Sequence, residues 1–390
     1  MINFHDLRGI QMEISSKCNA SCPKCNRNID GGYTLPWLNE VEMSLSQFKK
    51  IITPEIIENI NWLNFCGNYG DPGTATELAQ ICEYVRTTRN DFDMYIHTNG
   101  GMKSPEFWKN VSLNFLKSDS HNSTITFSID GLEDTNHIYR RGVSWERVIK
   151  NLEAAISTGA HITWEFLVFK HNQHQIDEAR ELANTMGVSK FTVKTAMGFS
   201  GNGEHRPSMK VVDNKGNHIY NIYETDDTRY NDKTTADLPT INDINSDPVT
   251  KSDLIYKHFK DLPNYEKDIQ NGEFSYLDGS EIDCNASHSK SIYIDAAGKV
   301  YPCCFLGENS QVTFSKHSYQ FDKWLDRQGL HQNGIDTKYF RVKDVMKNEN
   351  YFEKIRKSWD IHSHTDPEKV ISCSKFCKTD SHIMKRIYKK

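Results

Sequence analysis

Over the first half of the chain, short apolar runs alternate with stretches in which apolar residues recur at helical spacing. Six runs are candidate strands: Gly9–Ile14, Trp62–Cys66, Met94–Thr98, Thr124–Ile129, Ile162–Phe169 and Lys190–Lys194. Four amphipathic stretches are candidate helices: Leu45–Asn59, Thr76–Thr88, Ser144–Thr158 and His174–Met186. Strands separated by helices of ten or so residues predict βαβ units with parallel strands. We therefore expect an α/β fold, either a partial (βα)6 barrel or a doubly wound sheet.

The pattern changes near residue 200. Residues 201–280 are rich in Asn, Asp, Thr and Lys, and they predict a long connection with a short helix near Ser252–Asp261. Long connections are often functional, so this segment is also a candidate cover for a substrate. Beyond it, the sequence predicts a small hairpin and then helices: Ser291–Asp295 with Val300–Tyr301 around Gly298, Phe321–Arg327 and Val342–Ser358. We expect domains at 1–200, 201–280 and 281–390, the last being small and α+β.

Composition narrows the classes of partner. The formal net charge is -5 and basic residues form no block, which argues against nucleic acid or an anionic membrane as the main partner. No run approaches the ~20 apolar residues of a membrane span, and the N-terminus lacks the layout of a signal peptide. We therefore expect a cytoplasmic protein. Because that compartment is reducing, its ten cysteines are expected to serve as metal ligands rather than disulfides.

The first cysteine group follows directly on a predicted strand. The sequence Cys18-Asn-Ala-Ser-Cys22-Pro-Lys-Cys25 places three thiolates on one loop. Three thiolates can hold three corners of a [4Fe–4S] cubane and leave the fourth iron open, as a catalytic metal site requires. The alternative is zinc, which would need a fourth ligand nearby, and His5 lies before the strand rather than beside the loop.

This C-x3-C-x2-C loop resembles that of radical S-adenosylmethionine (SAM) enzymes, and motifs at later strand ends extend the resemblance over the first half of the chain. The resemblance implies that the element after the second strand, Gly67, Asn68, Gly70 and Asp71, binds the methionine amino group of SAM, with Asp71 where the family usually has Glu. It also implies that four residues line the ribose and carboxylate of SAM: Thr98, Asn99, Ser128 and Asp130. Arg140 or Arg141 would meet the SAM carboxylate, because guanidinium presents a fork of donors to it. Turn formation, helix capping and surface charge are the alternative roles of these residues.

A second cysteine group lies in the last third of the chain. Cys284, Cys303, Cys373 and Cys377 could ligate a [4Fe–4S] cluster completely, and a structural zinc site with four cysteine ligands is the alternative. Beside a radical SAM core, Cys284 with Gly298 and Cys303 resembles the opening of the SPASM and twitch auxiliary-cluster domains. The central cysteine run of a full SPASM domain is missing, which favours the twitch form with one auxiliary cluster. Cys304 is then surplus, with packing, alternative ligation or hydrogen-atom donation as its possible roles.

The resemblance also implies a reaction. A reduced cluster cleaves SAM to a 5′-deoxyadenosyl radical that abstracts hydrogen from a substrate, and a one-electron donor such as flavodoxin or ferredoxin supplies the electron. The auxiliary cluster would accept an electron, bind substrate or relay electrons. The first predicted strand begins within about ten residues, so we expect no leader-recognition domain and favour a small-molecule substrate over a peptide or protein side chain. A non-catalytic metal scaffold or redox sensor is the alternative from another class.

Two charged residues within predicted strands are candidates for acid–base chemistry. Glu165 lies in the fifth strand and Lys194 in the sixth. Side chains of this kind inside a barrel can exchange protons with a substrate. A structural ion pair or a solvent-facing position is the alternative.

Overall fold

The computed structural model describes residues 2–201, 204–231, 264–311, 316–330 and 334–379. The chain divides into two compact units. The first unit comprises Met1–Met12, Gln47–Asn64 and Ser252–Lys390, and the second comprises Glu13–Ser46 and Phe65–Lys251. Among the described residues, no helix is both long and apolar enough to cross a membrane.

The second unit is built on four parallel strands. They follow one another in the order β3 (Asp93–Thr98), β4 (Thr124–Ser128), β5 (Ile162–Val168) and β6 (Lys190–Thr195). Residues in register share a face of the strands, and one such row is Phe127, Trp164 and Phe191. This confirms the predicted α/β class with parallel strands, while closure into a partial (βα)6 barrel stays a prediction.

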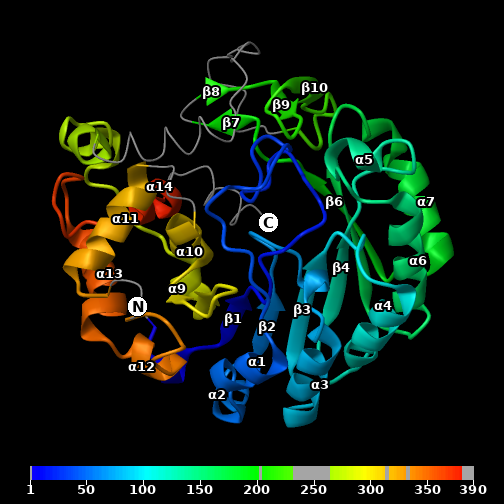
Figure 1. The fold of residues 1–390 in the computed structure, drawn as a ribbon, viewed down its shortest axis with the longest axis horizontal. Coiled ribbons are helices and arrows are strands. Elements are labelled where there is room, and N and C mark those ends of the chain that lie inside the picture. The colour runs from blue at the N-terminus through cyan, green and yellow to red at the C-terminus, as the bar shows by residue number, and fades with distance from the viewer. Residues whose placement is uncertain (1, 202–203, 232–263, 312–315, 331–333, 380–390) are drawn as a thin grey trace. The chain divides into compact units, whose positions relative to one another are not determined.

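Helices cover one face of these strands, as Figure 1 shows. They are α3 (Leu78–Thr88), α4 (Pro105–Ser112), α6 (Trp145–Ile156) and α7 (Ile176–Met186), with the short α5 (Asn136–Tyr139) before α6. The ring of Trp108 in α4 lies 5.3 Å from that of Phe127, so the aromatic row packs under the helices. The alternate residues of the strands, including Ser128 and Glu165, therefore point to the opposite face.

Local sequence explains where these helices begin and end. The hydroxyls of Ser104 and Ser144 accept hydrogen bonds from the first turns of α4 and α6. Gly187 ends α7 in a left-handed conformation, with φ of 86°. The predicted helix over Leu45–Asn59 is instead two helices, α1 (Leu45–Ile51) and α2 (Pro54–Asn59), because Pro54 can start a helix but cannot continue one.

The described part of the predicted connection contains paired strands. β7 (Ser200–Gly201) pairs with β8 (Glu204–His205), and β9 (Ser208–Val212) pairs with β10 (His218–Tyr223). The predicted long connection thus contains a hairpin that was not expected, which the turn at Gly216, with φ of 86°, closes. The helix expected near Ser252–Asp261 lies outside the described residues.

The first unit holds strands from both ends of the chain. Their order is β12 (Val300–Tyr301), β11 (Ser291–Ile294), β1 (Gly9–Met12) and β2 (Trp62–Phe65). β11 runs parallel to β1 and antiparallel to β12. The predicted hairpin around Gly298 is thus confirmed, and Gly298 turns the chain with φ of 91°.

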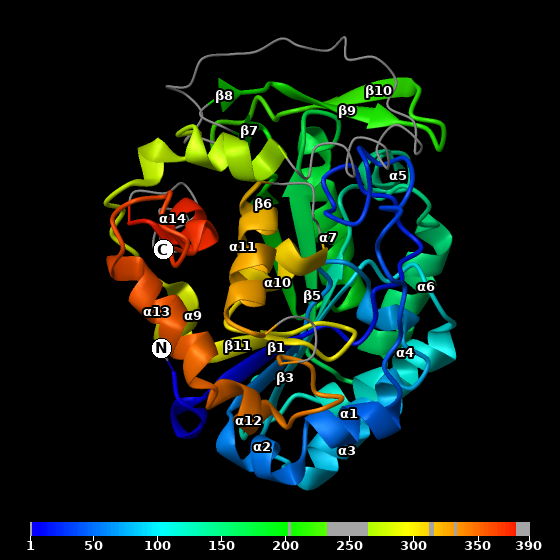
Figure 2. The ribbon, with the colours of Figure 1, turned by 60° about the vertical axis from the view of Figure 1, so that its left-hand side comes forward.

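Six further helices of the first unit lie near β11 and β12 in the sequence, the first of them before β11 and the other five after β12. They are α9 (Asn285–Ser289), α10 (Cys304–Gln311), α11 (Lys316–Arg327), α12 (Val342–Met346), α13 (Lys354–Lys357) and α14 (Ile371–Cys377). Figure 2 shows α10, α11 and α14 packed side by side, and these three helices contact one another. The predicted helix over Val342–Ser358 is broken after Met346, and a π-helical turn (Glu349–Glu353) precedes α13.

Candidate functional site

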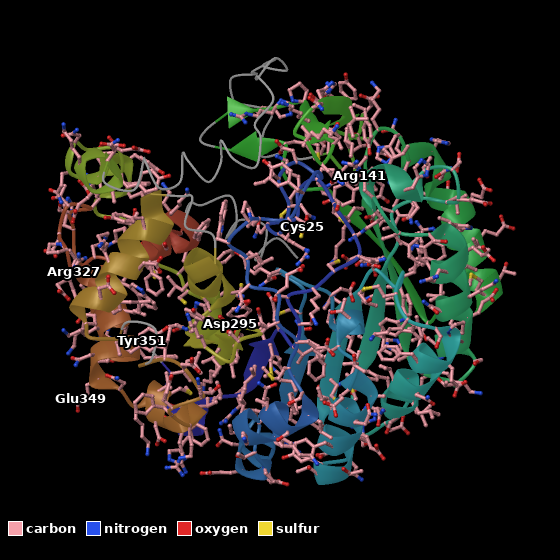
Figure 3. The ribbon with its side chains drawn as sticks, viewed as in Figure 1. Cys25, Arg141, Asp295, Arg327, Glu349 and Tyr351 are labelled. Carbon is pink, nitrogen blue, oxygen red and sulfur yellow. The ribbon has the colours of Figure 1, made fainter. Side chains whose placement is uncertain are left out.

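The three-cysteine loop lies entirely in the second unit, immediately after β1, and Figure 3 labels its Cys25. Hydrogen bonds fold the loop back on itself, from the Ala20 N–H to the Cys18 sulfur (3.3 Å) and from the Cys25 N–H to the Cys22 carbonyl (3.1 Å). Burial raises the pKa of each of the three thiols, that of Cys25 to about 12. A thiol must lose its proton to bind a metal, so metal binding here would release protons.

The loop after β2 is held against the cysteine loop by a residue that the sequence analysis missed. The buried Glu13 carboxylate accepts hydrogen bonds from the backbone N–H groups of Asn68 (3.1 Å) and Tyr69 (3.2 Å). The Asn68 carbonyl in turn lies 3.9 Å from the Cys25 sulfur. Glu13 could have been noticed as the one carboxylate within the apolar run Gly9–Ile14.

The predicted SAM-binding glycines lie where the chain approaches itself closely. A Cβ atom on Gly70 would come within 2.0 Å of the Ser15 carbonyl oxygen, and one on Gly67 within 2.6 Å of the Gly70 carbonyl oxygen. The side-chain Nδ2 of Asn68 is buried and has no hydrogen-bond partner among the described residues. A buried donor without an acceptor is costly, so this amide suits a ligand that supplies an acceptor.

Asp71, Thr98 and Asn99 form one hydrogen-bonded group. The buried Asp71 carboxylate accepts from the Thr98 hydroxyl (2.7 Å) and from the Asn99 backbone N–H (2.7 Å). Burial raises the pKa of this carboxyl, and these hydrogen bonds oppose the rise. The Asn99 side-chain amide then donates to the Cys18 sulfur (3.5 Å). Asp71 therefore orients Asn99 toward the cysteine loop.

The two adjacent arginines, Arg140 and Arg141, have different partners in the structure. Arg140 is paired with the fully buried Asp130 (2.6 Å) and brings its guanidinium within 4.0 Å of the Cys22 sulfur. The second oxygen of Asp130 accepts from the Leu167 N–H (2.7 Å), which fixes the carboxylate. Arg141 points elsewhere: it donates to the carbonyls of Gly31 and Val212 (2.7 Å for the latter), and Figure 3 shows it near the β9–β10 hairpin.

The remaining predicted residues of this unit lie on the uncovered face of the strands. Ser128 is in register with Glu165, whose carboxylate is ion-paired with the Lys194 ammonium. Burial lowers the pKa of the nearby His97, and the charge of Glu165 opposes the shift. The structure thus brings Glu165 and Lys194 together as an ion pair, which was the alternative to acid–base chemistry.

The second cysteine group lies entirely in the first unit. One small cavity is lined by all four predicted ligands: Cys284, Cys303, Cys373 and Cys377. Cys373 and Cys377 are four residues apart in α14, a spacing that places both sulfurs on one face of the helix. Pairing of the Asp283 N–H with the Cys377 carbonyl (2.7 Å) brings Cys284 beside them.

The rest of this cavity is mainly apolar, with Ile282, Pro302, Phe305 and Leu306 in its walls. Cys304, the first residue of α10, is not among the described residues that line it. All ten cysteines are thiols rather than disulfides. Across the described ranges, no three His, Cys, Asp or Glu side chains are gathered as closely as the ligands of a single metal ion. The donor set of four thiols in apolar surroundings suits an iron–sulfur cluster, whose ligands are spread over four irons.

One comparison with known protein families gives a match over the part of the chain that contains the first site. Residues 12–183 match the family model of the Radical SAM superfamily, a span that includes Cys18, Cys22, Cys25 and Arg140. No curated protein sequence matches the chain.

Several solved structures resemble the chain at low identity. SuiB from Streptococcus suis bound to S-adenosylmethionine is 14% identical with a TM-score of 0.45, covering 76% of this chain and 60% of that one. Histidine-tagged anSMEcpe with bound AdoMet is 14% identical with a TM-score of 0.49, covering 98% and 91%. Methylornithine synthase (PylB) is 13% identical with a TM-score of 0.36, covering 50% and 55%. The chain thus spans about 60% of the length of SuiB.

Proposed function

We propose that this protein, which matches the Radical SAM family model over residues 12–183, is an enzyme that cleaves SAM reductively and abstracts hydrogen from a small polar molecule. The observation that carries the proposal is the placement of the Asn99 amide and the Arg140 guanidinium against the sulfurs of the three-cysteine loop. When bound, a [4Fe–4S] cluster with SAM supplies the one-electron cleavage that yields the 5′-deoxyadenosyl radical. The protein supplies ligation, orientation and a dry site.

The roles of the chain's own residues follow from their contacts. Cys18, Cys22 and Cys25 would hold three irons and leave one iron for SAM. The unpartnered Asn68 amide would bind an acceptor on SAM, and the Gly67–Gly70 loop lets the ligand approach the backbone. Arg140, rather than Arg141, would pair with the SAM carboxylate, because the guanidinium of Arg141 is already committed to two carbonyls.

The face of β3–β6 that carries His97, Glu165 and Lys194 supports a polar substrate. A substrate that displaces one partner of the Glu165–Lys194 ion pair would place its oxygen or nitrogen within reach of the other group for proton exchange. A net oxidation or rearrangement is compatible with this arrangement.

For the first unit we propose one auxiliary [4Fe–4S] cluster held by Cys284, Cys303, Cys373 and Cys377. Four thiolates leave no open iron, which favours transfer of electrons over direct binding of substrate. The apolar walls of the cavity limit access of water, a factor that also sets the reduction potential of such a cluster.

The test is anaerobic reconstitution of the full chain followed by addition of dithionite and SAM. We expect 5′-deoxyadenosine and methionine as products, and about eight irons per chain for two cubanes. A protein with a full cluster on the three-cysteine loop that forms no 5′-deoxyadenosine would overturn the enzyme proposal. Four irons with one zinc would overturn the auxiliary cluster but leave SAM cleavage standing.

A further inference from the structure

Trp359 contributes an unusual buried donor to the four-cysteine cavity. It lies in the 3-10 turn Ser358–Asp360 that follows α13, and it lines the cavity together with Cys284, Cys303, Cys373 and Cys377. Its indole nitrogen is buried and has no hydrogen-bond partner within the part of the chain that the structure describes. Since a buried indole N–H usually finds an acceptor, its position in this cavity indicates that its partner is one of the groups that the cavity holds.

The sulfur of Cys373 is a candidate acceptor, because Cys373 lines the same cavity and its sulfur interacts with the Trp359 side chain. A metal-bound thiolate keeps its negative charge, and an indole N–H beside it stabilises that charge.

We propose that the Trp359 indole N–H donates a hydrogen bond to the Cys373 sulfur when the four cysteines hold the auxiliary [4Fe–4S] cluster, and that this bond makes the cluster easier to reduce. The inference rests on the auxiliary cluster of the proposed function. Hydrogen bonds to cluster sulfurs are among the factors that set reduction potentials. A donor stabilises the added negative charge of the reduced state more than the oxidised state, so its removal lowers the potential.

The ammonium of Lys369 also acts on Cys373, and its effect can be separated from that of the Trp359 indole. The Lys369 side chain is almost fully buried, donates to the Ile361 carbonyl, and attracts the charge of Cys373. Replacing Trp359 leaves this ammonium in place. A change in potential on that replacement therefore reports the indole N–H rather than the loss of all polar surroundings.

The test is Trp359→Phe in the reconstituted full chain, with the auxiliary potential measured by EPR-monitored redox titration. A parallel titration with Cys18, Cys22 and Cys25 all replaced by Ala isolates the auxiliary signal. We expect the ratio of reduced to oxidised cluster at a fixed potential to fall severalfold. A tenfold fall would correspond to about 59 mV for one electron.

Trp324→Phe is the matched control. Its indole N–H donates to the Glu368 carbonyl (3.0 Å), and Trp324 is not a residue of the cavity wall, so the potential should not move. A Trp359→Phe protein that keeps the auxiliary irons at an unchanged potential would overturn the inference. Loss of the auxiliary irons from the wild-type chain would instead overturn the proposed cluster.

If Trp359→Phe does not fold, the wild-type protein still provides the test. Labelling of tryptophan indole nitrogens with 15N should give a hyperfine coupling between one indole and the reduced auxiliary cluster. Absence of any coupled indole nitrogen would contradict the hydrogen bond.

Discussion

The two cysteine groups differ in what surrounds their thiols. Polar groups approach the three-cysteine loop, including the Asn99 amide and the Arg140 guanidinium. The four-cysteine cavity is walled mainly by apolar side chains such as Ile282, Phe305 and Leu306. A cluster that must bind and orient a charged cofactor needs donors beside an open iron, whereas one that only stores electrons needs complete ligation and little water.

The groups also differ in how the chain holds them. In the second unit, contacts from distant segments fix the loop, including the hydrogen bond from the Ser21 N–H to the Arg141 carbonyl (2.8 Å). In the first unit, helix α14 itself sets the spacing of Cys373 and Cys377. We therefore expect the loop to be sensitive to changes in its surroundings and the helix-borne pair to depend mainly on its own residues.

The largest expected effect comes from removing one thiol from each group. Cys22→Ala should abolish formation of 5′-deoxyadenosine, because two thiolates cannot hold the SAM-binding cluster. Cys373→Ala should retain formation of 5′-deoxyadenosine, and because its auxiliary cluster is left with three thiolates, the iron content should fall below about eight per chain. Product analysis with iron and sulfide counting on both reconstituted proteins makes the comparison.

The opposite pattern would contradict the assignment of the open iron to the three-cysteine loop. If Cys373→Ala lost SAM cleavage while Cys22→Ala kept it, the open site would belong to the first unit. Cys82→Ala is a suitable control, since Cys82 is buried in α3 and belongs to neither group.

The next largest effect concerns the two arginines. Arg140→Lys keeps a positive charge for the buried Asp130 but loses the fork of the guanidinium, so we expect SAM to bind roughly tenfold to a hundredfold more weakly. Arg141→Lys should change SAM affinity much less, because Arg141 donates to protein carbonyls. Equilibrium binding of SAM to both reconstituted variants measures the difference, and equal losses would refute the assignment to Arg140.

The arginines show where reasoning from sequence reaches its limit. The resemblance implied that residues 18–25, 67–71, 98–99, 128 and 130 form one site, as expected where the carboxyl ends of parallel strands share one edge. Which of two adjacent arginines turns inward depends on the partner that each finds, Asp130 for one and the Gly31 carbonyl for the other. Gly31 lies 110 residues before Arg141, and spacing alone does not identify such a partner.

The same reasoning applies to the fold. The short apolar runs predicted the ends of all six of these strands to within one or two residues. It did not predict the β9–β10 hairpin, because the segment around it is polar and β10 buries only Ile222, although β9 buries Met209, Val211 and Val212. It also missed α14, whose seven residues are too short to show a helical period.

Glu13 provides a smaller test of the sensitivity of the loop. Glu13→Gln keeps the shape but removes the charge that accepts the Asn68 and Tyr69 N–H groups, so we expect a loss of about 1–3 kcal/mol in the free energy of unfolding and weaker SAM binding. Denaturant unfolding of the apoprotein and SAM titration of the reconstituted protein measure the two effects. The matched control is Glu77→Gln, whose carboxylate accepts the Leu45 N–H (3.0 Å) rather than an N–H of the Gly67–Gly70 loop. Equal SAM affinities in both variants would mean that Glu13 only stabilises the fold.

The smallest expected effect is that of replacing Cys304, which is adjacent to the predicted ligand Cys303 in the first unit. Cys303 lines the four-cysteine cavity and Cys304 does not, although only one peptide bond separates them. Cys303→Ser should therefore lower the content of auxiliary iron, whereas Cys304→Ser should keep its irons, its formation of 5′-deoxyadenosine and its yield of substrate-derived product. Iron counting with both product assays distinguishes the three roles of Cys304. Loss of iron would identify a ligand, and loss of substrate product with intact SAM cleavage would identify a hydrogen-atom donor. Unchanged values in all three assays would leave packing, and the boundary between ligating and non-ligating thiols would then run between two neighbouring residues.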